Sequence, residues 1–289
     1  MNCKNREGKV VFKDNGQDNL LKLMYGSFAG RSVLSLLVKP WVSKAAGWFL
    51  NTKTSSLLVK PFIESNNIDM SDFVDKDFDS FNDFFIRNLK PGKRFINYDK
   101  KTLISPCDGR VSVYNIDENS TFKIKNSFYT VESLTHSKKA GNYYKGGKCV
   151  IIRLCVDNYH RYCYIDDGFK SANKFIPGVL HTVNPIACEN YNIYKENSRE
   201  CSILHTENFG KVMQIEVGAL MVGKIVNYDQ VSCISKGDEK GRFEFGGSTI
   251  VLLFNKDSVE IDNDLINNTN EGYETAVKMG ERIGKALFS

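Results

Sequence analysis

The stretch GRFEFGGSTIVLLF, residues 241–254, joins a pair of glycines to a run of apolar residues. The run at its end has the β-branched and aliphatic composition of a buried strand. Gly246 and Gly247 stand directly before Ser248, where the strand begins. The glycines fit either a tight turn or a backbone shaped so that the bond between Gly247 and Ser248 can be broken. The rest of the chain decides between these interpretations.

The chain after residue 104 has a strand-like pattern. Short apolar runs alternate with clusters of Gly, Asn and Asp, as in RVSVYNI, CVIIRLCV, KVMQIEVGALMVGKIV and STIVLLF. This alternation predicts a mostly antiparallel β domain over residues 96–289. The last stretch, GYETAVKMGERIGKALF, has a pattern compatible with a helix.

Residues 1–95 have a different pattern. Apolar residues recur at helical spacing from Asn19 to about Phe62, and SDFVDKDFDSFNDFFIRNL predicts a short helix with Ser71 as its N-cap. The fold class predicted for the whole chain is therefore α+β. A helical region, residues 1–95, precedes the β-rich region, residues 96–289.

Positive charge is concentrated in the first fifth of the chain. Residues 1–62 carry ten Lys or Arg and three Asp or Glu, a net charge of +7, whereas the whole chain carries +5. Both tryptophans, Trp41 and Trp48, lie in the same region. Tryptophan and lysine on one helix are typical of a membrane interface. A helix packed on its own domain with a solvated basic face is the open alternative, and without a basic reader motif we expect no nucleic acid partner.

Other features exclude several classes of protein. No apolar run approaches the ~20 residues that span a bilayer, and the polar N-terminus lacks the apolar core of a secretory signal. We therefore expect a cytoplasmic chain. The eight cysteines form no C-x-x-C pair and no zinc-like spacing with histidine. We expect no metal site and no disulfide, with reduced thiols acting as small core residues.

Three polar residues in the β-rich region are candidates for chemistry. Asp108 lies in the turn SPCDGRV, His160 lies in DNYHRYCYIDDG where a strand meets a loop, and Ser248 follows the glycine pair. Each has a plain structural interpretation, as a turn aspartate, a packed histidine or a strand serine. Together they supply the groups of a carboxylate–histidine–serine relay.

These motifs resemble those of the phosphatidylserine decarboxylase family, which is pyruvoyl-dependent and membrane-associated. The resemblance runs in the family's order through FNDFFIRNLKPGKRF, SPCDGRV, DNYHRYCYIDDG, TVNPIA, ENSRECSILHTENFG, IEVGALMVGKIV, KGDEKGRFEFGGST and GYETAVKMGERIG. Its most specific element is the Gly-Ser-Thr block behind F-x-F-G. The resemblance implies a carboxy-lyase that converts phosphatidylserine to phosphatidylethanolamine and CO₂.

The resemblance also implies that the chain cleaves itself between Gly247 and Ser248, giving a β chain, residues 1–247, and an α chain, residues 248–289. Ser248 becomes a pyruvoyl group, a covalent cofactor that forms a Schiff base with the serine amine of the substrate and accepts the electrons left by CO₂. The two chains are expected to remain together as a heterodimer, within a higher homo-oligomer. The expected location is peripheral, on the anionic cytoplasmic face of the cell membrane.

By this resemblance Asp108 is the acid of the relay and Ser248 its nucleophile. The family pattern H-R-x-H begins here at His160 but ends in Cys163, which stands where a second histidine is expected. Either His160 or a Cys163 thiolate is the base, and His205 is a reserve candidate. A thiol with an ordinary pKa near ~8.5 is a poor base at neutral pH, which favours His160.

Two other functions stay open at this level. Cys163 fits a processing-deficient, membrane-binding homologue without activity, which would give one uncut band on a denaturing gel. A pyruvoyl decarboxylase of a soluble amino acid is the weaker alternative, because that class lacks the SPCDGRV and DNYHRY motifs.

Overall fold

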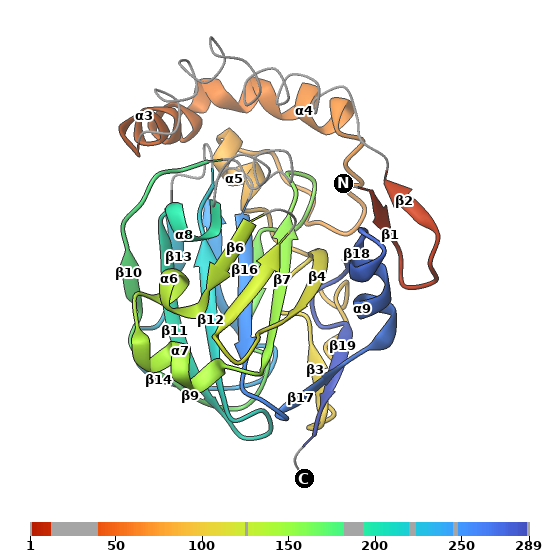
Figure 1. The fold of residues 1–289 in the computed structure, drawn as a ribbon. Helices are drawn as coiled ribbons and strands as arrows, with labels where there is room; N and C mark the ends of the chain where they lie inside the picture. The colour runs from red at the N-terminus through yellow and green to blue at the C-terminus, as the bar shows by residue number, and fades with distance from the viewer. Residues whose placement is uncertain are drawn as a thin grey trace.

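The computed structural model describes residues 2–12, 40–124, 127–181, 193–219, 224–244 and 248–287. Short helices and many strands make up these residues (Figure 1). The helical elements are α3 (Pro40–Leu50), the 3₁₀ helix η1 (Lys53–Leu58), α4 (Val59–Ser65), α5 (Phe81–Phe85), α6 (Val131–Thr135), α7 (Lys138–Tyr144), α8 (Ile193–Glu196) and α9 (Asn263–Asn270).

An 11-stranded main sheet forms the centre of the described structure. Its order is β14-β9-β11-β12-β16-β7-β4-β18-β1-β2, and β10 also pairs with β11. The strands are β1 (Cys3–Lys4), β2 (Val10–Phe12), β4 (Gly109–Asn115), β7 (Lys148–Leu154), β9 (Gly168–Lys170), β10 (Lys174–Ile176), β11 (Arg199–Thr206), β12 (Lys211–Val217), β14 (Ser232–Ile234), β16 (Ser248–Phe254) and β18 (Glu274–Val277).

Three smaller sheets accompany the main sheet. Their strands are β13 (Lys224–Asn227), β15 (Glu239–Glu244) and β8 (Arg161–Cys163); β17 (Val259–Ile261), β19 (Arg282–Ala286) and β3 (Thr102–Ile104); and β5 (Thr121–Ile124) with β6 (Ser127–Thr130). Among the paired strands of the described residues, only β1 and β18 run parallel. The predicted α+β class, with mostly antiparallel sheets, is confirmed.

The strand β16 lies near the middle of the main sheet, between β12 and β7. All seven of its residues are buried. A strand covered on both faces needs apolar side chains in succession rather than in alternation, which explains the run IVLLF. The prediction of a buried strand behind the glycine pair is therefore confirmed.

A helical layer lies over one end of the main sheet, where α3, α4 and α5 are drawn at the top of Figure 1. Its own small core contains Leu50, Val59, Phe81, Phe84 and Phe85. The predicted helices up to Phe62 are confirmed from residue 40 onward, and residues 19–39 lie outside the described part.

The helix α5 begins later than the sequence predicted. Its N-cap is Ser80, whose hydroxyl accepts a hydrogen bond from Asp83 N at 3.1 Å. Ser71 instead lies in a turn, and its backbone nitrogen donates a hydrogen bond to the side chain of Asp69. The serine nearer the aromatic run is the one that can satisfy the first free N–H groups of the helix.

Two predicted helical segments are strands. Within residues 1–95, β1 and β2 form a hairpin that joins the edge of the main sheet beside β18. The C-terminal stretch GYETAVKMGERIGKALF forms β18 and β19, separated by a turn in which Gly280 has a φ of +84°. Both segments are short, and neighbouring strands supply hydrogen-bond partners that a local pattern does not reveal.

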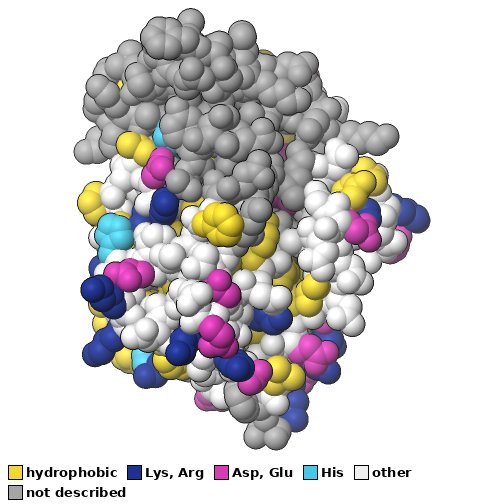
Figure 2. Space-filling view, in the orientation of Figure 1, with side chains coloured by type: hydrophobic (Ala, Val, Ile, Leu, Met, Phe, Trp, Pro, Cys, Tyr) yellow, Lys and Arg dark blue, Asp and Glu magenta, His cyan; other side chains and the backbone are white. Residues whose placement is uncertain are grey.

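The surface carries mixed charge, and acidic and basic side chains are interspersed on the face shown in Figure 2. No helix among the described residues is long and apolar enough to cross a membrane. The seven cysteines in the described ranges are free thiols, and Cys188 lies outside them. Five of the seven are buried, as expected for core residues, whereas Cys155 is half-buried and Cys233 is exposed.

Candidate active site

Ser248 is the first residue of β16 and lies opposite Leu154 of β7. Its side chain is fully buried, and its Oγ has no hydrogen-bond partner among the residues that the structure describes. A buried hydroxyl without a partner is costly and calls for an explanation. Gly246 and Gly247, and with them the carbonyl that Ser248 would attack, lie outside the described residues.

Asp108 lies in the turn between β3 and β4. A Cβ on the next residue, Gly109, would come within 2.9 Å of the carbonyl oxygen of Arg153 in β7, so glycine is needed for this close approach. The strand register places Arg110 opposite Arg153. Arg153 is next to Leu154, the residue opposite Ser248. The backbones at Asp108 and Ser248 are therefore at the same end of the sheet, two strand spacings or about 10 Å apart.

The carboxylate of Asp108 is held by two groups. Arg94 donates from Nε to Oδ1 at 2.8 Å and from Nη2 to Oδ2 at 2.6 Å, and Met279 N donates to Oδ1 at 2.8 Å. The Arg94 and Asp108 side chains are only 6% and 8% exposed. This forked pair fixes the orientation of the carboxylate. In this structure Asp108 thus bonds to Arg94, whereas the predicted relay would join it to His160.

His160 is fully buried next to the start of β8. Its ring packs on Phe85 of α5 with the centroids 4.0 Å apart, and its carbonyl accepts a hydrogen bond from Phe243 N at 2.9 Å. Phe243 lies in β15 and precedes Ser248 by five residues. The fold thereby brings His160 beside the segment that leads to Ser248.

The tautomer of His160 follows from its backbone contact. Nδ1 lies 2.9 Å from the carbonyl oxygen of Asn158, which can only accept a hydrogen bond. A neutral ring therefore carries its proton on Nδ1 and its lone pair on Nε2. The buried Arg87 donates to the carbonyls of Asp157 and Asn158 at 3.0 and 3.4 Å, which holds the loop that orients the ring.

Cys163 is buried in β8, and its backbone nitrogen donates to the carbonyl of Pro106 at 2.8 Å. It therefore lies beside the turn that carries Asp108. Burial raises the pKa of the Cys163 thiol to about 12, so the thiol is neutral near pH 7. This disfavours a thiolate base.

His205 lies far from the other candidates. It is exposed on β11 opposite Lys211, whereas Val217, six residues farther along β12, lies opposite Thr249. Six residues of strand span about 20 Å. The structure thus brings Asp108, His160, Cys163 and Ser248 to one end of the sheet and leaves His205 toward the other end.

A cleft of about 600 Å³ lies beside Asp108. The cationic side chains in its lining include Arg94, Arg110 and Lys278, and Tyr159 contributes an aromatic wall. The same lining also carries six carboxylates, those of Glu7, Asp69, Asp72, Asp108, Asp157 and Glu281, so the cleft presents both signs of charge beside the candidate site. No group of three or more His, Cys, Asp or Glu side chains in the described ranges is arranged to hold a metal ion.

Sequence reasoning missed two residues of this site, Arg94 and Phe85. Both lie in FNDFFIRNLKPGKRF, a motif that carried the family resemblance without any assigned role. The presence of both residues in this motif was the sequence signal that could have identified them as site residues. That Arg94 bonds Asp108 across the predicted boundary at residues 95 and 96 depends on tertiary packing.

Comparison with known proteins identifies the class to which this fold and site belong. The sequence model of the family described as phosphatidylserine decarboxylase matches residues 81–285. The chain therefore belongs to the phosphatidylserine decarboxylase family, whose members are carboxy-lyases.

Individual relatives match almost the whole chain. Phosphatidylserine decarboxylase proenzyme 2 of Clostridium acetobutylicum is 48% identical over 286 residues, which cover 97% of each chain. The phosphatidylserine decarboxylase proenzymes of Clostridium perfringens and Clostridium kluyveri are each 44% identical, covering 90% and 92% of each chain. The names of these relatives describe them as proenzymes.

Proposed function

We propose that this chain decarboxylates phosphatidylserine with a pyruvoyl group that it makes from Ser248. The observation that carries the proposal is a fully buried Ser248 hydroxyl without a partner among the described residues, at the same end of the sheet as Asp108 and His160. In the proposed cleavage the Ser248 oxygen leaves with the Gly247 carboxylate, so the hydroxyl needs no permanent hydrogen-bond partner. The proenzyme names of the relatives support the same reading.

Self-cleavage requires a base for the Ser248 hydroxyl. In the proposed step His160 Nε2 takes the proton, Oγ bonds to the carbonyl carbon of Gly247, and the peptide C–N bond breaks to leave an ester and a free amine. Loss of the Cα proton then expels the Gly247 carboxylate and leaves dehydroalanine. One water hydrolyses the imine tautomer to the pyruvoyl ketone and releases ammonia.

His160 is preferred to Cys163 as the base. Nε2 of a neutral imidazole ring bears a lone pair that can take a proton, whereas the Cys163 thiol keeps its own proton and is a poor base. The Asn158 carbonyl orients the ring, a role that the predicted relay gave to Asp108. We assign Asp108 to fixing the cleft next to the ring, as a carboxylate balanced by Arg94.

The second reaction is the loss of CO₂ from the substrate. The ketone supplies the electron sink for that loss. In the proposal His160 holds the proton that replaces CO₂, and Phe85 excludes water from its ring. In the proposal Arg110 and Lys278, two of the four cationic side chains in the mixed-charge lining of the cleft, face the anionic headgroup.

We propose that the helical layer binds the surface of an anionic membrane peripherally, on its cytoplasmic face. Trp48 and Leu57 are 75% and 78% exposed, and Lys53 and Lys60 lie exposed on the neighbouring η1 and α4. Exposed apolar side chains next to lysines suit a lipid interface. The side chain of Trp41 lies outside the described part.

After cleavage the large chain, residues 1–247, and the small chain, residues 248–289, would form the functional unit. The small chain supplies β16 and β18 to the main sheet, so separating the chains would expose a strand from the sheet's centre. We propose that the pair persists as a heterodimer within a higher homo-oligomer.

Intact-protein mass spectrometry and a denaturing gel test the proposal. The wild type should give two chains, the smaller beginning with a pyruvoyl group at position 248, and Ser248→Ala should remain one uncut chain without activity. Asp108→Asn should leave mostly precursor, because Arg94 loses its fork partner. An uncut wild-type chain without a ketone would instead support the processing-deficient homologue, and activity on free serine alone would support the soluble-substrate alternative.

A further inference from the structure

The N-terminal hairpin binds a part of the chain that lies at the other end of the sequence. Strand β1 pairs in parallel with β18, with Cys3 opposite Glu274 and Lys4 opposite Thr275. Figure 1 shows this hairpin at the edge of the main sheet, beside α9 and β18. Residues 2–12 therefore contact the segment that becomes the small chain in the proposed cleavage.

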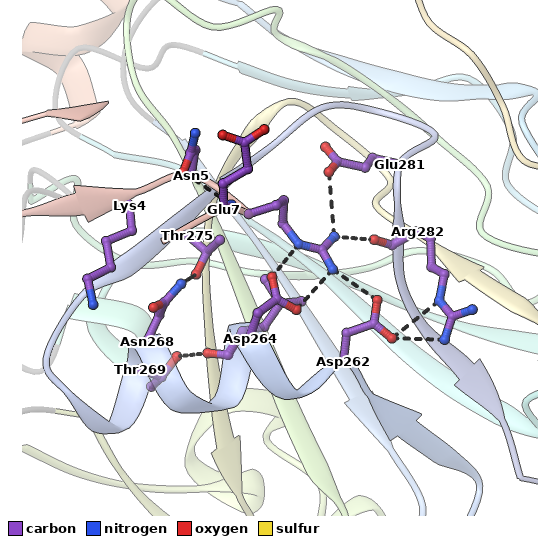
Figure 3. Close-up of polar contacts among 12 residues, drawn as sticks. Lys4, Asn5, Glu7, Asp262, Asp264, Asn268, Thr269, Thr275, Glu281 and Arg282 are labelled. Carbon is purple, nitrogen blue, oxygen red and sulfur yellow. Dashed lines mark hydrogen bonds and ion pairs between the residues drawn. The ribbon is translucent and has the colours of Figure 1, made fainter. Parts of the chain in front are cut away.

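Arg6 lies at the centre of this contact. Its Nε and Nη2 donate to the two carboxylate oxygens of Asp264 at 2.5 and 3.0 Å, and Nη2 also donates to Asp262 at 3.0 Å. Its Nη1 reaches Glu281 at 3.5 Å and the carbonyl oxygen of Arg282 at 2.5 Å. All four partners lie after residue 248, and Figure 3 shows Asp262, Asp264 and Glu281 converging on one guanidinium group.

This network has the features of a strong ionic contact. The Arg6 side chain is 26% exposed and that of Asp262 is 17% exposed, so solvent screens the pair only in part. The forked contact with Asp264 matches the planar geometry of a guanidinium group, which lysine cannot reproduce. Lys4 adds a contact with Glu271 at 2.5 Å.

The partners of Arg6 belong to three parts of the small chain, and one of them, Arg282, is the first residue of β19. Asp262 and Asp264 lie at the start of α9, and Glu281 lies in the turn between β18 and β19. That turn touches the candidate site through Met279 N, which donates to Asp108 at 2.8 Å. Arg6 thus joins the large chain to the half of the small chain that does not lie in β16.

We propose that Arg6 is an inter-chain clamp, which fastens α9 and the 278–282 turn of the small chain to the N-terminal hairpin of the large chain. The clamp rests on the proposed cleavage, because only a cut chain has two pieces to hold together. The central strand β16 retains one half of the small chain. The other half is held by the pairing of β18 with β4 and of β19 with β3, and the clamp adds an ionic contact to these strand pairs.

Three variants of the full chain test the clamp. Arg6→Ala removes the guanidinium group, and Arg6→Lys keeps the charge without the fork. Lys9→Ala is the matched control, because Lys9 lies in the same hairpin, its side chain is 78% exposed and its ion pair is with Glu7 of the same chain. A denaturing gel reads cleavage, and size-exclusion chromatography in moderate urea reads release of the small chain.

We expect all three variants to be cleaved. Release of the small chain should be about 30-fold faster in Arg6→Ala than in Lys9→Ala, since truncating one partner of a partly buried charge network acts mainly on dissociation. Arg6→Lys should fall between them. Amide exchange should rise over residues 262–282 in Arg6→Ala and stay unchanged over β16.

Equal release and equal exchange in Arg6→Ala and Lys9→Ala would overturn the clamp. If the wild type is not cleaved, the proposed function fails. In that case amide exchange over residues 262–282 that is the same in uncut Arg6→Ala and in the uncut wild type would also overturn the Arg6 contact. If Arg6→Ala does not fold, Asp264→Asn weakens the same fork from the other side. Asp264→Asn that releases its small chain no faster than Lys9→Ala would then count against the clamp.

Discussion

The two ends of the main sheet each hold a histidine next to a phenylalanine, and they differ in almost every other respect. At one end His160 is fully buried with its ring 4.0 Å from Phe85. Toward the other end His205 is exposed, with its ring 6.4 Å from Phe169, itself 44% exposed. The first ring has one orientation and one tautomer set by Asn158. Burial and a fixed partner, rather than residue type, therefore mark the candidate base.

The largest effect should come from replacing the two histidines in turn. His160→Gln should slow self-cleavage by about 100-fold to 10,000-fold, the usual contribution of a positioned base. His205→Gln should cleave at the wild-type rate, because it lies about 20 Å along the sheet from Ser248. A time course on denaturing gels measures both rates. Equal rates for the two variants would mean that another group removes the Ser248 proton.

The two phenylalanines should differ in their contribution to stability. Phe85→Ala should lower the free energy of unfolding by about 3–5 kcal/mol, because Phe85 is fully buried and the change leaves a cavity beside His160. Phe169→Ala should change it by about 0.5 kcal/mol or less, as for other surface substitutions. Urea denaturation of variants that also carry Ser248→Ala keeps every chain uncut. A similar midpoint for both would show that α5 does not brace the site.

The smallest effect should come from two cysteines. Because burial raises the pKa of Cys163 to about 12, its thiol stays neutral and shielded at pH 8, whereas Cys233 is exposed. Iodoacetamide should label Cys233 and leave Cys163 unmodified, as read by peptide mass spectrometry. Cys163→Ala should cleave itself at the wild-type rate. Slow cleavage in a correctly folded Cys163→Ala variant would make the Cys163 thiol a candidate base again.

Part of the site was readable from the sequence because its residues lie in short local motifs. Ser248 follows two glycines, and Asp108 precedes a glycine that must approach β7 closely. The sequence favoured His160 and kept His205 as a reserve candidate, but the distance of His205 from Ser248 was not readable. It depends on the register of β11, β12 and β16, and register is set by contacts across the sheet.

The elements that the sequence misassigned are those with weak local patterns. Segments β1, β18 and β19 are short, and each is stabilised as a strand by neighbours that are distant in the chain. Two of the ten basic residues that suggested a membrane surface, Lys4 and Arg6, pair with acids after residue 260. Charge counts cannot separate a solvated cation from one whose partner lies across the fold.

By itself the sequence determined the α+β class, the buried strand behind Gly247, and the family, because composition and short motifs are properties of neighbours in the chain. Only the tertiary structure decided that Arg94 holds Asp108, that Phe85 packs on His160, and that Arg6 binds Asp264. Each of these contacts joins residues at least 14 positions apart. Such pairs form only when the sheet and its helical layer bring the segments together.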